Sequence, residues 1–168
     1  LIKYVDNVLR IFRMPVSVFF ISMVGFYILL LAFGLNPWLA FVGALAYGLS
    51  SFFFQILAAG HNTQAIALAY MPPVIGRIYY AYRHNALKGA LFTALILSLE
   101  LLANHPQITY YALICLLIFV IIEFIWSVKE KSIPKFIRTS VILIVPFVIA
   151  LGINFSNLYT IYEYGKYS

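Results

Sequence analysis

The 168-residue chain is 64% hydrophobic and only 10% charged. This composition excludes an ordinary soluble domain, which needs far more polar surface to stay dissolved. The net charge of +6 does not indicate nucleic-acid binding, because the basic residues flank apolar stretches instead of clustering on a polar face. Apolar stretches of nearly bilayer length alternate with short polar clusters, which is the pattern of successive transmembrane helices.

Residues 1–14 form the first predicted element. Leu1, Val5, Val8 and Phe12 recur at helical spacing, and charged or polar residues take most other positions. This pattern predicts an amphipathic helix that lies in the membrane interface. Because the chain starts without Met and stops just after a polar, aromatic stretch, we expect a piece of a longer protein, with residues 1–14 ending a preceding outer loop.

Residues 15–168 are expected to form an all-α, polytopic transmembrane bundle of about six spans. The predicted spans are 16–34, 38–59, 65–82, 89–103, 107–127 and 138–157. Pro72-Pro73 and Pro146 fall inside spans and predict kinks, whose freed carbonyl groups should face protein or a polar cavity. In the second span, Ala40, Ala44 and Gly48 place small residues on one face, which predicts close approach of another helix.

The basic residues predict the orientation. The loops 77–88 and 129–138 are rich in Lys and Arg, and such loops face the cytoplasm. Two spans separate them, so the prediction is self-consistent. It places the connections 60–64 and 104–107 at the exterior or periplasmic face. Arg77 and Glu123 lie near cytoplasmic span ends, where we expect their long side chains to reach the headgroups.

The two outer connections carry the candidate binding residues. Each is rich in neutral polar groups and opens a helix, so unpaired N–H groups and a positive dipole end point outward beside a histidine. This arrangement favours an anion such as phosphate. The alternative is that Asn62, Thr63 or His105 merely caps its helix. The candidate residues of the connections are His61, Asn62, Gln64, Asn104, His105 and Gln107.

Glu100 is a further candidate, because it lies one helical turn before Asn104 and a carboxylate in hydrocarbon is costly. Two interpretations stay open: a neutral, hydrogen-bonded structural carboxyl, or a group that holds a sugar hydroxyl or orients His105. Cys115 is the only cysteine, and the sequence contains no metal-binding or nucleotide-binding motif. We therefore expect no metal site and no cofactor.

Several segments together resemble the YfhO family of bacterial membrane proteins. They are Ala46-Tyr47-Gly48-Leu49-Ser50, Ala59-Gly60-His61-Asn62-Thr63, Ala69-Tyr70-Met71-Pro72, Ala103-Asn104-His105-Pro106-Gln107-Ile108-Thr109-Tyr110-Tyr111 and Tyr162-Glu163-Tyr164-Gly165-Lys166-Tyr167-Ser168. The resemblance implies a GT-C type glycosyltransferase in the bacterial cytoplasmic membrane. Its donor would be a polyprenyl-phosphate-linked sugar and its acceptor a cell-envelope glycan or lipid at the outer face. The catalytic acid of such enzymes precedes this segment, so no catalytic residue is assigned.

Two other functions remain open. Kinked helices and an intramembrane carboxylate also describe a transporter or lipid flippase, although no inverted repeat is visible. A non-catalytic membrane scaffold would need neither feature. For the glycosyltransferase, donor binding would involve His61, Asn62, His105 and Gln107 near the phosphate, with Glu100 and Asn104 near the sugar.

Overall fold

The computed structural model describes Ile2 and residues 14–166, and within these residues it consists of α-helices joined by short connections, with no strand. The predicted all-α class is therefore confirmed. The predicted interfacial helix over 1–14 lies outside the described residues, apart from Ile2 and Met14. The helices are α2 (Val16–Ala32), α3 (Pro37–Gly48), α4 (Ser51–Ala58), α5 (Asn62–Arg83), α6 (Ala86–Leu102), α7 (Pro106–Lys129), α8 (Ile133–Ile153) and α9 (Phe155–Tyr164).

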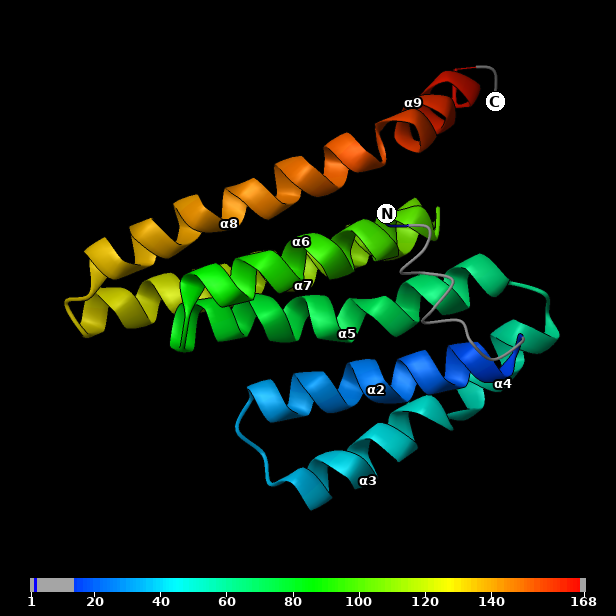
Figure 1. Ribbon diagram of the computed structural model, residues 1–168, viewed down its shortest axis with the longest axis horizontal. Coiled ribbons are helices and arrows are strands. Elements are labelled where there is room, and N and C mark those ends of the chain that lie inside the picture. Colours follow the sequence, from blue (N-terminus) through cyan, green and yellow to red (C-terminus); the bar gives the residue numbers. More distant parts are fainter. Residues whose placement is uncertain (1, 3–13, 167–168) are drawn as a thin grey trace.

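The helices pack side by side with α5 at the centre (Figure 1). α3 packs on α2, α2 on α5, α5 on α6 and α7, and α6 on α8. α4 continues in the direction of α3 and α9 in that of α8, while the other successive helices run in opposite directions, so the connections between them gather at two ends of the bundle. We call one the polar end, which contains His61, Asn104 and Asn154. The other is the basic end, which contains Arg83 and Lys131.

Three helical stretches are long and apolar enough to cross a membrane: Pro37–Ala58, Pro106–Lys129 and Ile133–Ile153. Their outward faces leave large apolar side chains uncovered, for example Leu117 at 61% and Val148 at 62% exposed. Continuous apolar surface of this kind indicates contact with lipid or with another membrane segment. The 22-residue α5 is less apolar because most of its side chains face neighbouring helices instead of lipid.

The two prolines inside α5 free two carbonyl groups, and both face protein. In a regular helix the carbonyls of Leu68 and Ala69 would accept hydrogen bonds from residues 72 and 73. Both are prolines and have no N–H to donate. The Tyr47 hydroxyl donates to the Leu68 carbonyl at 3.0 Å. The Ala69 carbonyl lies against Gly25 of α2, where a Cβ atom would come within 2.7 Å of the oxygen. The expectation that freed carbonyls face protein is confirmed at this site.

The small-residue face of α3 also packs as predicted. Ala40 and Ala44 are buried at 0% and 3% exposure, and Gly48 faces Met23 and Ser22 of α2 without room for a side chain. Close approach of two helices without large side chains increases their van der Waals contact, which drives helix association in membranes.

Two predicted spans differ from the helices observed. The second is interrupted, because Ser50 is extended (ψ 147°) between α3 and α4; Gly48 and Ser50 are poor helix formers placed close together. The sixth begins earlier, at Ile133, and its helix ends at Ile153 instead of continuing to 157. There the Asn154 side chain donates to the Ser98 carbonyl at 3.1 Å and to the Ala150 carbonyl at 3.0 Å.

The expectation for Glu123 is wrong. Its side chain is only 6% exposed and so does not reach the headgroups. It forms an ion pair with Arg83, in which Nη2 and Oε1 are 2.8 Å apart. The pair joins α5 to α7. A buried carboxylate next to a guanidinium costs less free energy than one that stands alone, which explains its position. The Arg77 guanidinium lies over the Phe92 ring, 4.9 Å from its centroid.

Candidate functional site

The polar end brings the sequence-predicted residues together. A single core cluster contains Ala65 and Ile66 from the first turn of α5, Ala103 after α6 and Ile108 from the first turn of α7. The two polar connections therefore lie over one shared core. His61, Asn62, Asn104 and Gln107 are exposed, while Gln64 and His105 are partly buried. Whether these residues bind a substrate stays a prediction.

Neither α5 nor α7 has a side-chain cap. The N-cap residues are His61 and His105, and neither side chain bonds to its helix. The capping alternative for Asn62, Thr63 and His105 is therefore wrong. The Asn62 and Ile108 N–H groups bond to the Gly60 and His105 carbonyls, and Pro106 has no N–H. Among the described residues, the first-turn N–H groups of Thr63, Gln64 and Gln107 remain for a ligand, with the positive dipole end behind them. The Gln107 amide donates to the Tyr111 hydroxyl at 3.0 Å, which places this side chain along α7.

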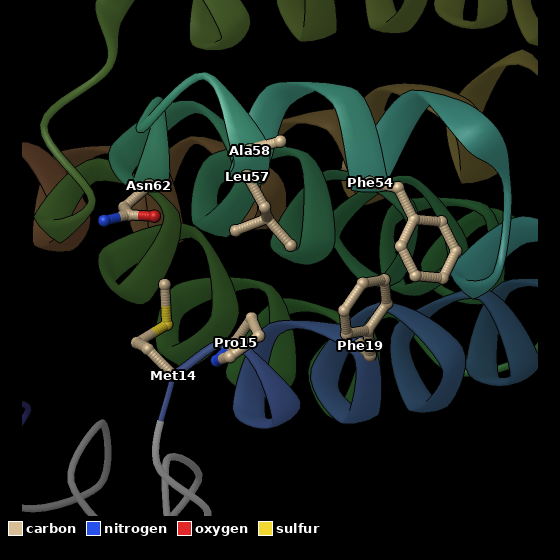
Figure 2. A pocket seen from close by; sticks show the side chains of 7 residues that line it. All are labelled: Met14, Pro15, Phe19, Phe54, Leu57, Ala58 and Asn62. Atoms are coloured by element: carbon tan, nitrogen blue, oxygen red, sulfur yellow. The ribbon is translucent and has the colours of Figure 1, made fainter.

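An apolar groove leads to the start of α5 (Figure 2). Figure 2 shows Met14, Pro15 and Phe19 on one side and Phe54 and Leu57 of α4 on the other. The Phe19 and Phe54 rings are 4.8 Å apart between centroids. The groove has a volume of about 410 Å³, and Asn62 is the polar residue at its end. An apolar chain with a polar head fits such a surface.

Glu100 is closed off from the surface, since its residue is only 2% exposed. Its Oε1 accepts a hydrogen bond from the Thr109 hydroxyl at 2.9 Å. Its Oε2 is buried and has no hydrogen-bond partner among the described residues. The structure therefore links Glu100 to Thr109 and not to His105. A sugar hydroxyl would reach the carboxyl group only if the contact between α6 and α7 opened.

Thr109→Val should destabilise the bundle by about 1–3 kcal/mol, because the substitution leaves the buried Glu100 carboxyl without its hydrogen-bond donor. Thr109→Ser keeps the hydroxyl and should restore most of the loss. Unfolding in mixed micelles, followed by circular dichroism, measures the difference.

Thr160→Val is the matched control for this measurement. It removes an exposed hydroxyl that bonds only within its own helix, to the Ser156 carbonyl. Its free energy of unfolding should stay near that of the wild type. An equal loss in Thr109→Val and Thr160→Val would contradict a special role for the bond between Glu100 and Thr109.

A second hollow lies at the same end, next to α9. It has a volume of about 580 Å³ and is lined by Asn104 together with residues of α9, among them Asn157, Thr160 and Tyr164. Amide and hydroxyl groups beside an aromatic ring are typical of surfaces that contact carbohydrate or lipid headgroups. Asn157 lies 53 positions after Asn104, and no local sequence pattern pairs the two.

Sequence reasoning missed the apolar groove and Thr109. The facing groove residues Phe19 and Phe54 belong to different helices and are 35 positions apart in the chain, and no local pattern joins them. Thr109 is nine positions from Glu100, across a helical connection. The sequence signal was that a buried carboxyl group needs a hydrogen-bond donor. That expectation does not identify which residue provides the donor.

The fold and the site define an α-helical membrane protein in which two uncapped helix starts and an apolar groove meet at one end of the bundle. No family model, no curated protein and no solved structure matches the chain. The resemblance to the YfhO family and the GT-C fold that it implies therefore stay predictions.

Proposed function

We propose that the chain is the donor-binding part of a membrane glycosyltransferase that uses a polyprenyl-phosphate-linked sugar. The observation that carries the proposal is the groove that ends at Asn62, on the first turn of the uncapped α5. The polyprenyl chain would lie between α2 and α4. Its phosphate would accept hydrogen bonds from Asn62 and the free N–H groups of α5, where the helix dipole stabilises negative charge.

The chemistry of the proposed reaction requires stabilisation of a leaving group. An acceptor hydroxyl on a cell-envelope glycan or lipid attacks the anomeric carbon, a carboxylate base takes its proton, and the lipid phosphate leaves. Hydrogen-bond donors fixed at the phosphate stabilise the charge that develops there. His61 beside Asn62, and His105 with Gln107 on the neighbouring helix start, would supply further donors. Asn104 and the hollow beside α9 would face the sugar or the acceptor.

We also propose that all six long helical stretches cross the membrane with the polar end outside. α5 has 22 residues, or about 33 Å at 1.5 Å per residue, and α2 and α6 have 17 each, the lower limit for a span. Most of the described basic residues flank the other end, as the positive-inside rule requires of a cytoplasmic face. These residues are Arg83, Lys88, Lys129, Lys131, Lys135 and Arg138.

The test measures binding of a polyprenyl phosphate and of the matching uncharged polyprenol to the purified protein in detergent. Asn62→Ala should weaken binding of the polyprenyl phosphate roughly tenfold or more, because it removes one hydrogen bond to a charged group. It should barely change binding of the polyprenol. His61→Ala should act in the same direction. Ala58→Trp fills the groove and should weaken binding of both lipids.

Ala59→Trp is the matched control, because Ala59 is an exposed neighbour outside the groove lining, and it should bind like the wild type. Wild-type affinity for the phosphate in Asn62→Ala, His61→Ala and Ala58→Trp would overturn the site.

A lipid flippase is the second candidate, favoured by the buried Glu100 with its unpartnered oxygen. Reconstitution in vesicles separates the two functions. A glycosyltransferase forms a new glycosidic bond, whereas a flippase moves lipid without forming one.

A further inference from the structure

Two cavities meet at the basic end of the bundle, away from the proposed donor site. The first is polar, has a volume of about 130 Å³ and lies among the ends of α5, α7 and α8. The second is an apolar groove of about 320 Å³ between the same three helices. Tyr82 lines both, and its hydroxyl is 2.8 Å from the Ser140 hydroxyl at their boundary. Together they form one elongated surface that is polar at one end and apolar at the other.

The apolar groove continues inward from the polar cavity. Along α8 its lining extends from Ser140 to Leu151, about 16 Å at the helical rise per residue. The remaining lining comes from Ile78 of α5 and from Leu116 and Val120 of α7. Ser140 lies about 10 Å along α8 from Ile133, and Leu151 lies two residues before the end of the helix. An acyl chain that enters from the basic end would therefore extend past the middle of α8.

The charges of the polar cavity are balanced. Arg83 and Glu123 form an ion pair with each other. After this pair, one cation and one anion remain in the lining, Lys135 and Glu130, and both are exposed. A ligand with one negative and one positive group would complement them, whereas a purely anionic ligand would meet the Glu130 carboxylate. Glu130 follows the end of α7 and Lys135 lies in the first turn of α8, so the helix dipoles reinforce the same polarity.

Two residues with hydroxyl groups also line this cavity. Ser127 is 9% exposed and Thr139 is 3% exposed, and both belong to the lining. A headgroup in the cavity would therefore meet two hydroxyl groups that can donate or accept hydrogen bonds.

We propose that the basic end binds one phospholipid whose headgroup carries both a phosphate and a primary ammonium. The phosphate lies near Lys135 and the start of α8, and the ammonium donates to Glu130 near the end of α7. The Ser127 and Thr139 hydroxyls complete the headgroup contacts. One acyl chain lies in the groove between α7 and α8. A primary ammonium is favoured over a quaternary one because it donates hydrogen bonds to a carboxylate.

Native mass spectrometry of the whole chain in detergent tests the site, with equal amounts of phosphatidylethanolamine, phosphatidylcholine and phosphatidylglycerol. One phosphatidylethanolamine should be retained in preference to the other two. Lys135→Ala and Glu130→Gln should each lower its retention roughly tenfold, the effect of one charge-assisted hydrogen bond. Val148→Trp, at an exposed position in the groove lining, should abolish it.

Two matched controls keep the wild-type retention. Lys131→Ala removes a cation from the connection between α7 and α8 that does not line the cavity. Val145→Trp adds an indole at an exposed position of α8 outside the groove. Equal retention of the three lipids, or wild-type retention in the three site variants, would overturn the proposal. So would retention of a second protein copy that Val148→Trp removes, since the groove would then be a helix interface.

Discussion

Gly25→Ala is expected to lower the free energy of unfolding by about 1 kcal/mol, although alanine is the better helix former. The new Cβ atom would lie 2.7 Å from the Ala69 carbonyl oxygen and 2.9 Å from Pro73 Cδ. Both are rigid parts of α5, so α2 must move away from α5. The cost of overpacking, about 1–3 kcal/mol and occasionally more, exceeds the helix-propensity gain of about 1 kcal/mol. Unfolding in mixed micelles measures the change.

Gly152→Ala is the control with the opposite expected sign. Nothing lies within 4 Å of a Cβ atom at position 152, so the substitution should stabilise α8 by about 0.5–1 kcal/mol. Gly25→Ala should also weaken binding of polyprenyl phosphate, since α2 carries Phe19, one side of the groove. A Gly25→Ala protein as stable as the wild type would contradict the packing of α2 on α5.

Arg83→Ala is expected to cost about 3 kcal/mol. It removes the partner of Glu123, whose side chain is 6% exposed, and leaves a carboxylate buried without a cation. Breaking a buried pair costs about 3–5 kcal/mol, and we expect the lower end because the Arg83 side chain is 34% exposed. Thermal unfolding of the purified protein in detergent at neutral pH measures the loss.

The double variant Arg83→Ala/Glu123→Gln should recover part of this stability, because no unpaired charge then remains in the bundle. Lys88→Ala changes an exposed cation near the same connection and should leave the unfolding transition unchanged. If Lys88→Ala costs as much as Arg83→Ala, the loss reflects the net charge of the basic end and not the pair with Glu123.

The two ends of the bundle have different proposed roles. The polar end presents helix starts without caps, which suit a phosphate, and an apolar groove for the attached chain. The basic end presents a charge-balanced cavity, which suits a phosphate together with an ammonium. The two sites share no lining residue, so substitutions in one should leave lipid binding at the other intact.

Composition and periodicity alone determined the helical class and the approximate positions of the helices. They also determined that the neutral polar connections lie at one end of the bundle and the basic connections at the other. These features are local: apolar runs, prolines and charges act on their own segment of chain whatever its neighbours are. The close approach of the face with Ala40 and Gly48 was also predictable, because spacing along one helix defines that face.

Only the tertiary structure decided which side chains meet across helices. It paired Arg83 with Glu123, Thr109 with Glu100 and Tyr47 with the Leu68 carbonyl. It also formed the groove beside Asn62 and ended α8 at Ile153 through the contacts of Asn154. Each of these features depends on the packing distance and rotation between two helices, and neither quantity is encoded in the period of one segment.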